Sequence, residues 1–195
     1  MARSTYGSGG PTISKIVAVV VAYNRRELLA ETLSALLQQT LPLHAIVVVD
    51  NASEDGSGEV ARNLAPEADV VTLTRNTGGA GGFTVGIERA VSRHSADQVW
   101  VMDDDTVPTP TALEELVAVA DRLPGARLLA SRVVWTDGRD HPMNTPRAWR
   151  LRSRRVDDAL SGVDGFAFRS ASFVSLLIPA ALVRGRGLPI ADYFL

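Results

Sequence analysis

The sequence contains no cysteine, and this absence narrows the chemistry open to its sites. Without cysteine the chain forms neither disulfides nor thiolate metal sites, and it has no thiol nucleophile. No apolar run approaches the ~20 residues of a membrane-spanning helix. The first residues also lack the apolar run behind a basic cluster that marks a secretory signal. We therefore predict a flexible tail over residues 1–12, one domain over residues 13–195, and a cytoplasmic location.

An excess of positive charge is also missing. Lysine and arginine number 20 and aspartate and glutamate 22, which gives a formal net charge of −2. This balance does not steer the chain towards nucleic acid, so we expect no nucleic-acid partner. Any site for an anion must be built locally.

What is present is a regular alternation of short apolar runs and amphipathic segments. Apolar runs predict strands at residues 16–22, 45–49, 70–73, 98–102, 128–135 and 172–178. Helical periodicity and end signals predict helices over residues 27–39, 57–64 and 109–123. They also predict a helix that follows the glycine-rich turn and ends at residue 94, and a short helical start at 179–183. Alternating strands and helices predict an α/β fold with a mostly parallel central sheet, helices on both faces, and ligands beyond the carboxyl ends of the strands.

Three consecutive aspartates, Asp103, Asp104 and Asp105, directly follow the predicted strand 98–102. Adjacent carboxylates repel one another unless a cation compensates, and hard oxygen ligands favour Mg²⁺ or Mn²⁺. In an extended segment Asp103 and Asp105 would point one way and Asp104 the other. The position at a strand end favours a metal and diphosphate site at Asp103 and Asp105 over an acidic turn that caps the next helix.

Two further strand ends carry groups that suit a nucleoside. Tyr23 follows the first strand and could stack on a base, although an isolated aromatic residue usually packs in the protein. Asp50 ends the second strand and could accept hydrogen bonds from a base or ribose. The sequence DNAS at residues 50–53 is also ordinary Asx-turn chemistry, which is the better explanation of Asp50 taken alone.

Arg75 and Asn76 follow the third strand and open a glycine-rich turn that includes Gly79. Glycines at the start of a helix let backbone amides approach a phosphate or a base closely, and an arginine adds a cation. Close packing of the helix is an equally good explanation of the glycines. The turn lacks the lysine of a P-loop.

Four motifs in this order resemble the family-2 inverting glycosyltransferases of the GT-A fold. They are VVAYNR at residues 20–25, VVDNAS at 48–53, RNxGG at 75–79 and WxMDDD at 100–105. The resemblance covers residues 16–121. The sequences RNTGGAGGF and MDDD look especially like those of actinobacterial galactofuranosyltransferases, with rhamnosyltransferases as close relatives.

The resemblance implies a UDP-sugar donor, a galactofuranosyl group, Mn²⁺ or Mg²⁺, and a cell-wall or polyprenyl-linked glycan acceptor. It also implies roles for matching residues: Tyr23 and Asp50 at the nucleoside, Arg75, Asn76 and Gly79 near base or diphosphate, Asp103 at ribose or metal, Asp104 towards the donor sugar, and Asp105 on the metal.

Inversion further requires a carboxylate that removes the proton of the acceptor hydroxyl. The family's base motif, of the Trp-x-Asp-Asp or Glu-Asp type, would follow the last sheet strand. Asp192 does not match that motif. We therefore expect a truncated chain, with the catalytic base beyond Leu195, and assign no catalytic residue.

A basic stretch with one tryptophan runs from Arg147 to Arg155. We favour a solvated loop over its alternative, a contact with a lipid-linked acceptor or with headgroups at the inner face of the cell membrane.

Three rival functions stay open at this point. A haloacid-dehalogenase-type phosphatase would use Asp103 as nucleophile and Asp105 as acid/base, but its motif belongs on an opening strand, and no lysine follows. A dinucleotide-dependent oxidoreductase would need a G-x-G-x-x-G turn after the first strand, which is absent here. A non-catalytic nucleotide-sugar-binding module would keep every motif and lack only the base.

Overall fold

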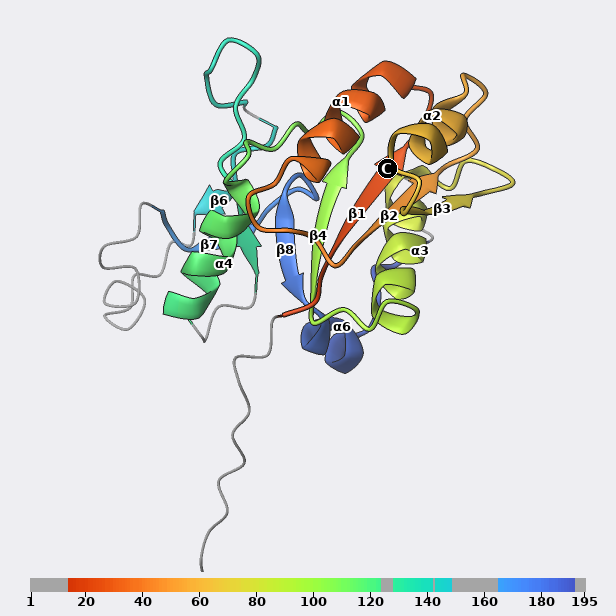
Figure 1. The fold of residues 1–195 in the computed structure, drawn as a ribbon. Coiled ribbons are helices and arrows are strands. Elements are labelled where there is room, and N and C mark those ends of the chain that lie inside the picture. The colour runs from red at the N-terminus through yellow and green to blue at the C-terminus, as the bar shows by residue number, and fades with distance from the viewer. Residues whose placement is uncertain (1–13, 124–127, 142, 149–164, 192–195) are drawn as a thin grey trace, which may run out of the picture.

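A six-stranded sheet of order β3-β2-β1-β4-β8-β5 forms the centre of the chain (Figure 1). The structure is a computed structural model that describes residues 14–123, 128–141, 143–148 and 165–191, so the predicted tail lies outside the described residues. The first four strands are parallel: β1 (Ile16–Ala22), β2 (Ala45–Asp50), β3 (Asp69–Thr72) and β4 (Gln98–Asp103). β8 (Leu176–Pro179) runs antiparallel to β4, and β5 (Leu129–Ala130) runs antiparallel to β8.

Helices cover both faces of this sheet, as predicted. They are α1 (Arg26–Leu37), α2 (Ser57–Leu64), α3 (Gly78–Ser92), α4 (Ala112–Arg122) and α6 (Ala180–Arg186). Alternate β1 side chains point to opposite faces because the pleat has a period of two. Ala18 and Val20 lie in a core with Leu33 of α1, whereas Val19 packs with Ile87 of α3. Both faces of β1 are therefore buried, which explains its continuous apolar run.

Glycines set how closely α3 lies on β1. A Cβ atom added at Gly82 would lie 2.6 Å from Val21 Cγ1, and one added at Gly86 would lie 2.3 Å from Val19 Cγ1. No side chain fits at these two positions, so the helix backbone rests directly on the sheet. Close helix packing is thus the explanation for this part of the glycine-rich segment.

The sheet differs from the sequence prediction at its β5 edge. Of the strand predicted over residues 128–135, only β5 joins the central sheet, while Val134 forms an isolated bridge with Asp140. The strand predicted over 172–178 begins at Leu176. Ser175 has φ +52°, so the chain is not extended there, and the ladder ends where the Ser131 amide donates to the Ser175 carbonyl at 3.1 Å. Between the strands predicted over 128–135 and 172–178, where no strand was predicted, lies a small second sheet of β6 (Arg147–Ala148) and β7 (Phe168–Ser170).

The amino end of β3 is fixed by ion pairs around Asp69. Its carboxylate accepts two hydrogen bonds from Arg89, at 2.7 and 2.9 Å, and lies 2.9 Å from His94 Nε2 and 3.5 Å from Arg93 Nε. The hydrogen bonds from Arg89 are the largest of the effects that lower the pKa of Asp69 to about 2.

None of the helices in the described part of the chain combines the length and the apolar character that a membrane span requires.

Candidate functional site

The register of the parallel strands brings the predicted site residues to one edge of the sheet. Asp50, the last residue of β2, is paired with Ala22 of β1, and Asp103, the last residue of β4, is paired with Val21 of β1. Figure 1 shows the arrowheads of β1 and β4 pointing to this edge, while β8 points away from it. The residues that follow β1, β2 and β4 therefore converge, as the sequence predicted.

Asp104 ties the loop after β1 to the loop after β4. Its Oδ2 atom accepts a hydrogen bond from the Tyr23 amide at 2.9 Å, and its carbonyl accepts one from Thr32 Oγ1 of α1 at 2.9 Å. These contacts leave Asp104 4 % exposed. The structure thus gives Asp104 a role in holding the edge together, and its contact with a donor sugar stays a prediction.

One cation, Arg25, faces two of the three aspartates. Arg25 Nη1 donates to Asp105 Oδ2 at 2.5 Å and lies 3.6 Å from Asp104 Oδ1. The Arg25 and Asp105 side chains are 51 % and 43 % exposed, so this pair lies at the surface of the site and is open to exchange. Sequence reasoning noted Arg25 as part of a motif but missed this pairing.

The predicted alternation of the three aspartates is wrong in one respect. β4 ends at Asp103, and the chain turns at Asp104 and Asp105 instead of continuing extended. Asp105 therefore shares Arg25 with Asp104 and does not simply repeat the direction of Asp103. A turn around a cation relieves the repulsion that three carboxylates on a straight strand would suffer.

The environment of Asp103 raises the pKa of its carboxyl group strongly. Burial first, and then the charges of Asp105 and Asp104, together raise its pKa to about 6, and Arg25 opposes the shift. Burial also raises the pKa of Asp104, against the hydrogen bond from the Tyr23 amide. The site therefore holds more negative charge than its own cation compensates, which is the condition that favours an added cation.

Asp50 and Asn51 have different tasks at the end of β2. Asp50 Oδ1 accepts a hydrogen bond from the Ser53 amide at 2.9 Å, so the Asx turn predicted as its alternative role is formed. Asn51 is buried and holds the start of α3: its Oδ1 accepts from the Thr77 amide at 2.9 Å, and its Nδ2 donates to the Gly78 carbonyl at 3.0 Å. This link between β2 and α3 was not foreseen from the sequence.

The glycine-rich turn starts with a second Asx turn. Asn76 Oδ1 accepts a hydrogen bond from the Gly78 amide at 2.8 Å, and Gly78 has φ +67°, which a glycine adopts without strain. Gly79 is the second residue of α3 and is half-buried. Arg75 is exposed and forms no ion pair within the described ranges of the chain. Its guanidinium is therefore available to a ligand.

The loop after β1 is held in a shape that leaves the Tyr23 ring outside. Asn24 has φ +53°, and its amide donates to Ser53 Oγ at 3.1 Å while its Oδ1 accepts from the Glu54 amide at 2.8 Å. Tyr23 is 45 % exposed at the same edge. An exposed ring on a fixed backbone can stack on a base, but the structure alone does not require it.

The donor atoms at this edge decide whether it could hold a metal ion. Among the described residues, no three His, Cys, Asp or Glu side chains are grouped so that they could hold a metal ion without help. A substrate-bridging Mg²⁺ or Mn²⁺ needs less, because it is held by one or two carboxylates, with phosphate oxygens and water completing its shell. Asp103 and Asp105 supply hard oxygen donors and excess negative charge, so the residues present fit such an ion.

Comparison with known proteins decides the family. The family model described as glycosyl transferase family 2 matches residues 17–177, a range that contains the carboxyl ends of β1, β2, β3 and β4. This chain belongs to glycosyltransferase family 2. The resemblance indicated by the four motifs is confirmed, and membership decides against the phosphatase and oxidoreductase alternatives.

Curated relatives of this chain include galactofuranosyltransferase GlfT1 from two mycobacteria. The Mycobacterium tuberculosis H37Rv protein is 31% identical over 182 residues, which are 84% of this chain and 58% of the relative. The Mycolicibacterium smegmatis protein is 37% identical over 98 residues, which are 50% of this chain and 32% of the relative. The chain thus spans between a third and three-fifths of the length of these relatives.

Solved structures confirm the GT-A fold of this chain. Staphylococcus aureus TarS 1-349 in complex with UDP aligns with a TM-score of 0.66 and 22% identity, covering 88% of this chain and 48% of that one. Mannosyltransferase PcManGT from Pyrobaculum calidifontis, in complex with GDP-Man and Mn²⁺, aligns with a TM-score of 0.60 and 20% identity, covering 93% and 49%. At these identities the likeness concerns the fold.

The basic stretch from Arg147 to Arg155 falls largely outside the described residues, as does Asp192. Arg147 is exposed and lies in β6. The solvated loop stays the prediction for this stretch, and the contact with membrane or acceptor stays its alternative.

Proposed function

We propose that this chain forms the nucleotide-sugar site of an inverting galactofuranosyltransferase. The donor would be UDP-galactofuranose, and the acceptor a hydroxyl of a cell-wall or polyprenyl-linked glycan, reached in the cytoplasm at the inner face of the cell membrane. The likeness to GlfT1 supports the choice of sugar. The observation that carries the proposal is the acidic edge, where Arg25 pairs with Asp104 and Asp105 and the third carboxylate, Asp103, has a raised pKa.

The nucleoside would lie between the loop after β1 and the end of β2. Tyr23 presents an exposed ring there. Asp50 is only 4 % exposed and its Oδ1 is used by the Asx turn, so a ribose or base donor would have to reach the buried Oδ2. The diphosphate would approach the start of α3, where helix amides and the positive end of the helix dipole favour an anion. Asn76, Gly79 and the exposed Arg75 lead into that helix end.

Asp103 and Asp105 would hold the divalent cation, Mn²⁺ or Mg²⁺. When bound, such a cation stabilises the negative charge of the departing UDP as a Lewis acid. Arg25 has to share or release Asp105 Oδ2 for this. Because the pair is exposed, breaking it costs little free energy. Asp104 keeps its hydrogen bonds to Tyr23 and Thr32 and so holds the two loops in place.

The acceptor hydroxyl must lose a proton as it attacks the anomeric carbon from the side opposite UDP. We assign this base role to none of the described residues. Asp103 and Asp105 are engaged on the donor side, and Asp104 is buried. The base predicted beyond Leu195 stays a prediction, and the non-catalytic binding module stays the alternative.

A panel of donors tests the proposal. Isothermal titration calorimetry with Mn²⁺ present would compare UDP-galactofuranose, UDP-galactopyranose, UDP-N-acetylglucosamine and GDP-mannose. We expect UDP-galactofuranose to bind at least about tenfold more tightly than GDP-mannose, a difference of about 1.4 kcal/mol. Equal or tighter binding of GDP-mannose would overturn the choice of nucleotide. Preference for another UDP-sugar would overturn the choice of galactofuranose.

A further inference from the structure

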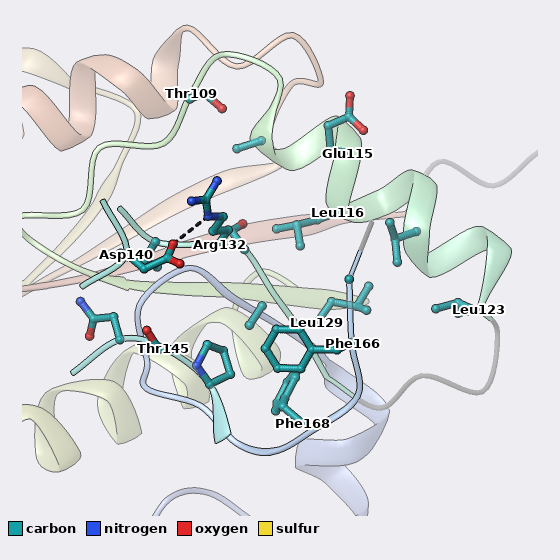
Figure 2. Close-up of a pocket in the computed structure, with 18 residues that line it drawn as sticks. Thr109, Glu115, Leu116, Leu123, Leu129, Arg132, Asp140, Thr145, Phe166 and Phe168 are labelled. Atoms are coloured by element: carbon teal, nitrogen blue, oxygen red, sulfur yellow. Dashed lines mark hydrogen bonds and ion pairs between the residues drawn. The ribbon is translucent and has the colours of Figure 1, made fainter. Parts of the chain in front are cut away.

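A pocket of about 510 Å³ lies between α4, β5 and described residues within 131–133, 140–146 and 165–168 (Figure 2). None of the predicted donor-site residues lines it. Its volume falls in the range of sites that enclose a small molecule. The function assigned to the acidic edge leaves this pocket unexplained.

The two ends of the pocket differ in chemistry. One end is apolar and is lined by Leu116, Val119, Leu123, Leu129, Phe166 and Phe168. The other end is polar and carries Arg132, Asp140, Asn144 and Thr145. In Figure 2 the Arg132–Asp140 pair lies away from Leu123 and Phe168, so polar and apolar groups are separated along the pocket. Such a lining suits a ligand that is itself amphipathic.

The strand register orients the pocket relative to the acidic edge. Ala130 of β5 is paired with Leu176 of β8, and Leu176 is paired with Val101, two residues before the end of β4. Ser131 and Arg132, which follow Ala130, therefore lie towards the edge at which Asp103 ends β4. Leu129, one residue earlier in β5, lies farther from that edge, at the apolar end of the pocket. Helix α4 runs from the edge towards this apolar end (Figure 1).

We infer that this pocket binds the aliphatic chain of an amphipathic acceptor whose hydroxyl-bearing head lies at the Arg132–Asp140 end. The inference rests on the proposed function and identifies where its acceptor would be held. A head at the polar end is directed to the edge that holds the donor, while the chain lies along α4. Removing the aliphatic chain and the phenylalanine and leucine side chains from water makes binding favourable.

The polar end suits a sugar head. Arg132 Nε donates to Asp140 Oδ1 at 2.7 Å, and the two side chains are 73 % and 57 % exposed. An exposed pair of this kind contributes little to folding, so its donors and acceptors can turn to the hydroxyl groups of a ligand. Asn144 adds an amide with both a donor and an acceptor at the same end.

Titration with alkyl β-galactopyranosides tests the inference without a donor. Calorimetry with the full chain would compare the methyl, hexyl, octyl and decyl glycosides, each kept below micelle formation. We expect no measurable binding of the methyl glycoside and a dissociation constant that falls about two- to fourfold for each added methylene. Absence of binding by all four, or a constant that does not vary with chain length, would overturn the inference.

Matched variants locate the binding. Phe166 is 53 % exposed and Val119 is half-buried, so Phe166→Ser and Val119→Ser leave the buried core intact. Both should flatten the chain-length dependence. Leu37→Ser replaces an apolar side chain that is 57 % exposed at the end of α1, outside the pocket, and should change nothing. Equal weakening by Leu37→Ser would show detergent-like adsorption and overturn the inference.

The outcome is separable from that of the donor site. UDP binding with Mn²⁺ and no binding of the alkyl glycosides would contradict the pocket assignment alone. Alkyl glycoside binding that depends on Phe166, with no UDP binding, would contradict the proposed function and retain an amphipathic site.

Discussion

Asp69 and Asp103 are partly buried carboxylates at opposite edges of the same sheet, and their surroundings shift their pKa values in opposite directions. Asp69 begins β3 among Arg89, Arg93 and His94, and its pKa falls to about 2. Asp103 ends β4 beside two further carboxylates, and its pKa rises to about 6. The first arrangement stabilises the fold. The second costs stability unless a cation is added, and this difference marks the edge at Asp103 as the site that serves a ligand.

Removing the Asp69 charge should produce the largest change in stability. We expect Asp69→Asn to lower the free energy of unfolding at pH 7 by about 2 kcal/mol, because a pKa lowered by roughly two units corresponds to that free energy. Urea denaturation measures it. Asp121→Asn, at an exposed position of α4, serves as control and should stay within about 0.5 kcal/mol of wild type. Equal stability of the Asp69 variant and wild type would show that the ion pairs contribute nothing net.

The same pair of proteins predicts a pH dependence. The folded pKa of Asp69 lies below its unfolded value, so the unfolded chain binds more protons between about pH 4 and pH 2. The Asp69 contribution is therefore complete above that window and is lost as the pH falls through it. Denaturation curves at several pH values should show the difference between wild type and Asp69→Asn shrinking from pH 5 towards about pH 2. A constant difference would contradict the assignment to ionisation.

At the other edge, removing a charge should stabilise the protein. The raised pKa of Asp103 means that its ionisation costs folding free energy, a cost that appears as the pH rises from about 4 to about 6. We expect Asp103→Asn to raise the free energy of unfolding of the metal-free protein at pH 7 by about 1 kcal/mol, with partial exposure reducing the effect. The gain should vanish below about pH 4. A less stable variant at pH 7 would show that Asp103 makes structural contacts that outweigh the repulsion.

The smallest expected effect concerns Arg25, the positively charged side chain at the acidic edge. Arg25 pairs with Asp105, whereas the neighbouring Arg26 lies 3.6 Å from Glu27, outside the acidic edge. We expect Arg25→Gln to tighten Mn²⁺ binding about threefold in the absence of nucleotide, since an exposed ion pair competes only weakly. Arg26→Gln should leave it unchanged. Mn²⁺ titration followed by electron paramagnetic resonance measures both, and weaker binding in the Arg25 variant would refute competition.

Much of the fold was predictable because its signals are local and strong. The β1 run is apolar throughout, since α1 and α3 cover its two faces, and short runs at β2 and β4 repeat the pattern. Strand ends then predict which residues meet, because parallel strands share one edge. The strand predicted over residues 128–135 was wrong in length, because the pairing of β5 depends on the turn at Ser175 and on an antiparallel partner, β8, from far along the chain.

The candidate site was predictable in membership and less so in geometry. Residue types at strand ends identified Tyr23, Asp50 and Asp103, and the register brings them to one edge. The turn at Asp104 and the pairing of Arg25 with Asp105 depend on tertiary contacts that no spacing in the sequence encodes. The amphipathic pocket was missed for the same reason, because segments on both sides of it are far apart in the sequence.

The proposed function requires the acidic edge to bind UDP through a divalent cation. Calorimetric titration of UDP, with and without Mn²⁺, into wild type, Asp105→Ala and Asp121→Asn tests it most directly, with circular dichroism to show that each protein is folded. We predict binding by wild type and Asp121→Asn only when Mn²⁺ is present, and none by Asp105→Ala. Binding of UDP that ignores the metal, or that survives Asp105→Ala unchanged, would contradict the account, as would absence of binding by the folded wild type.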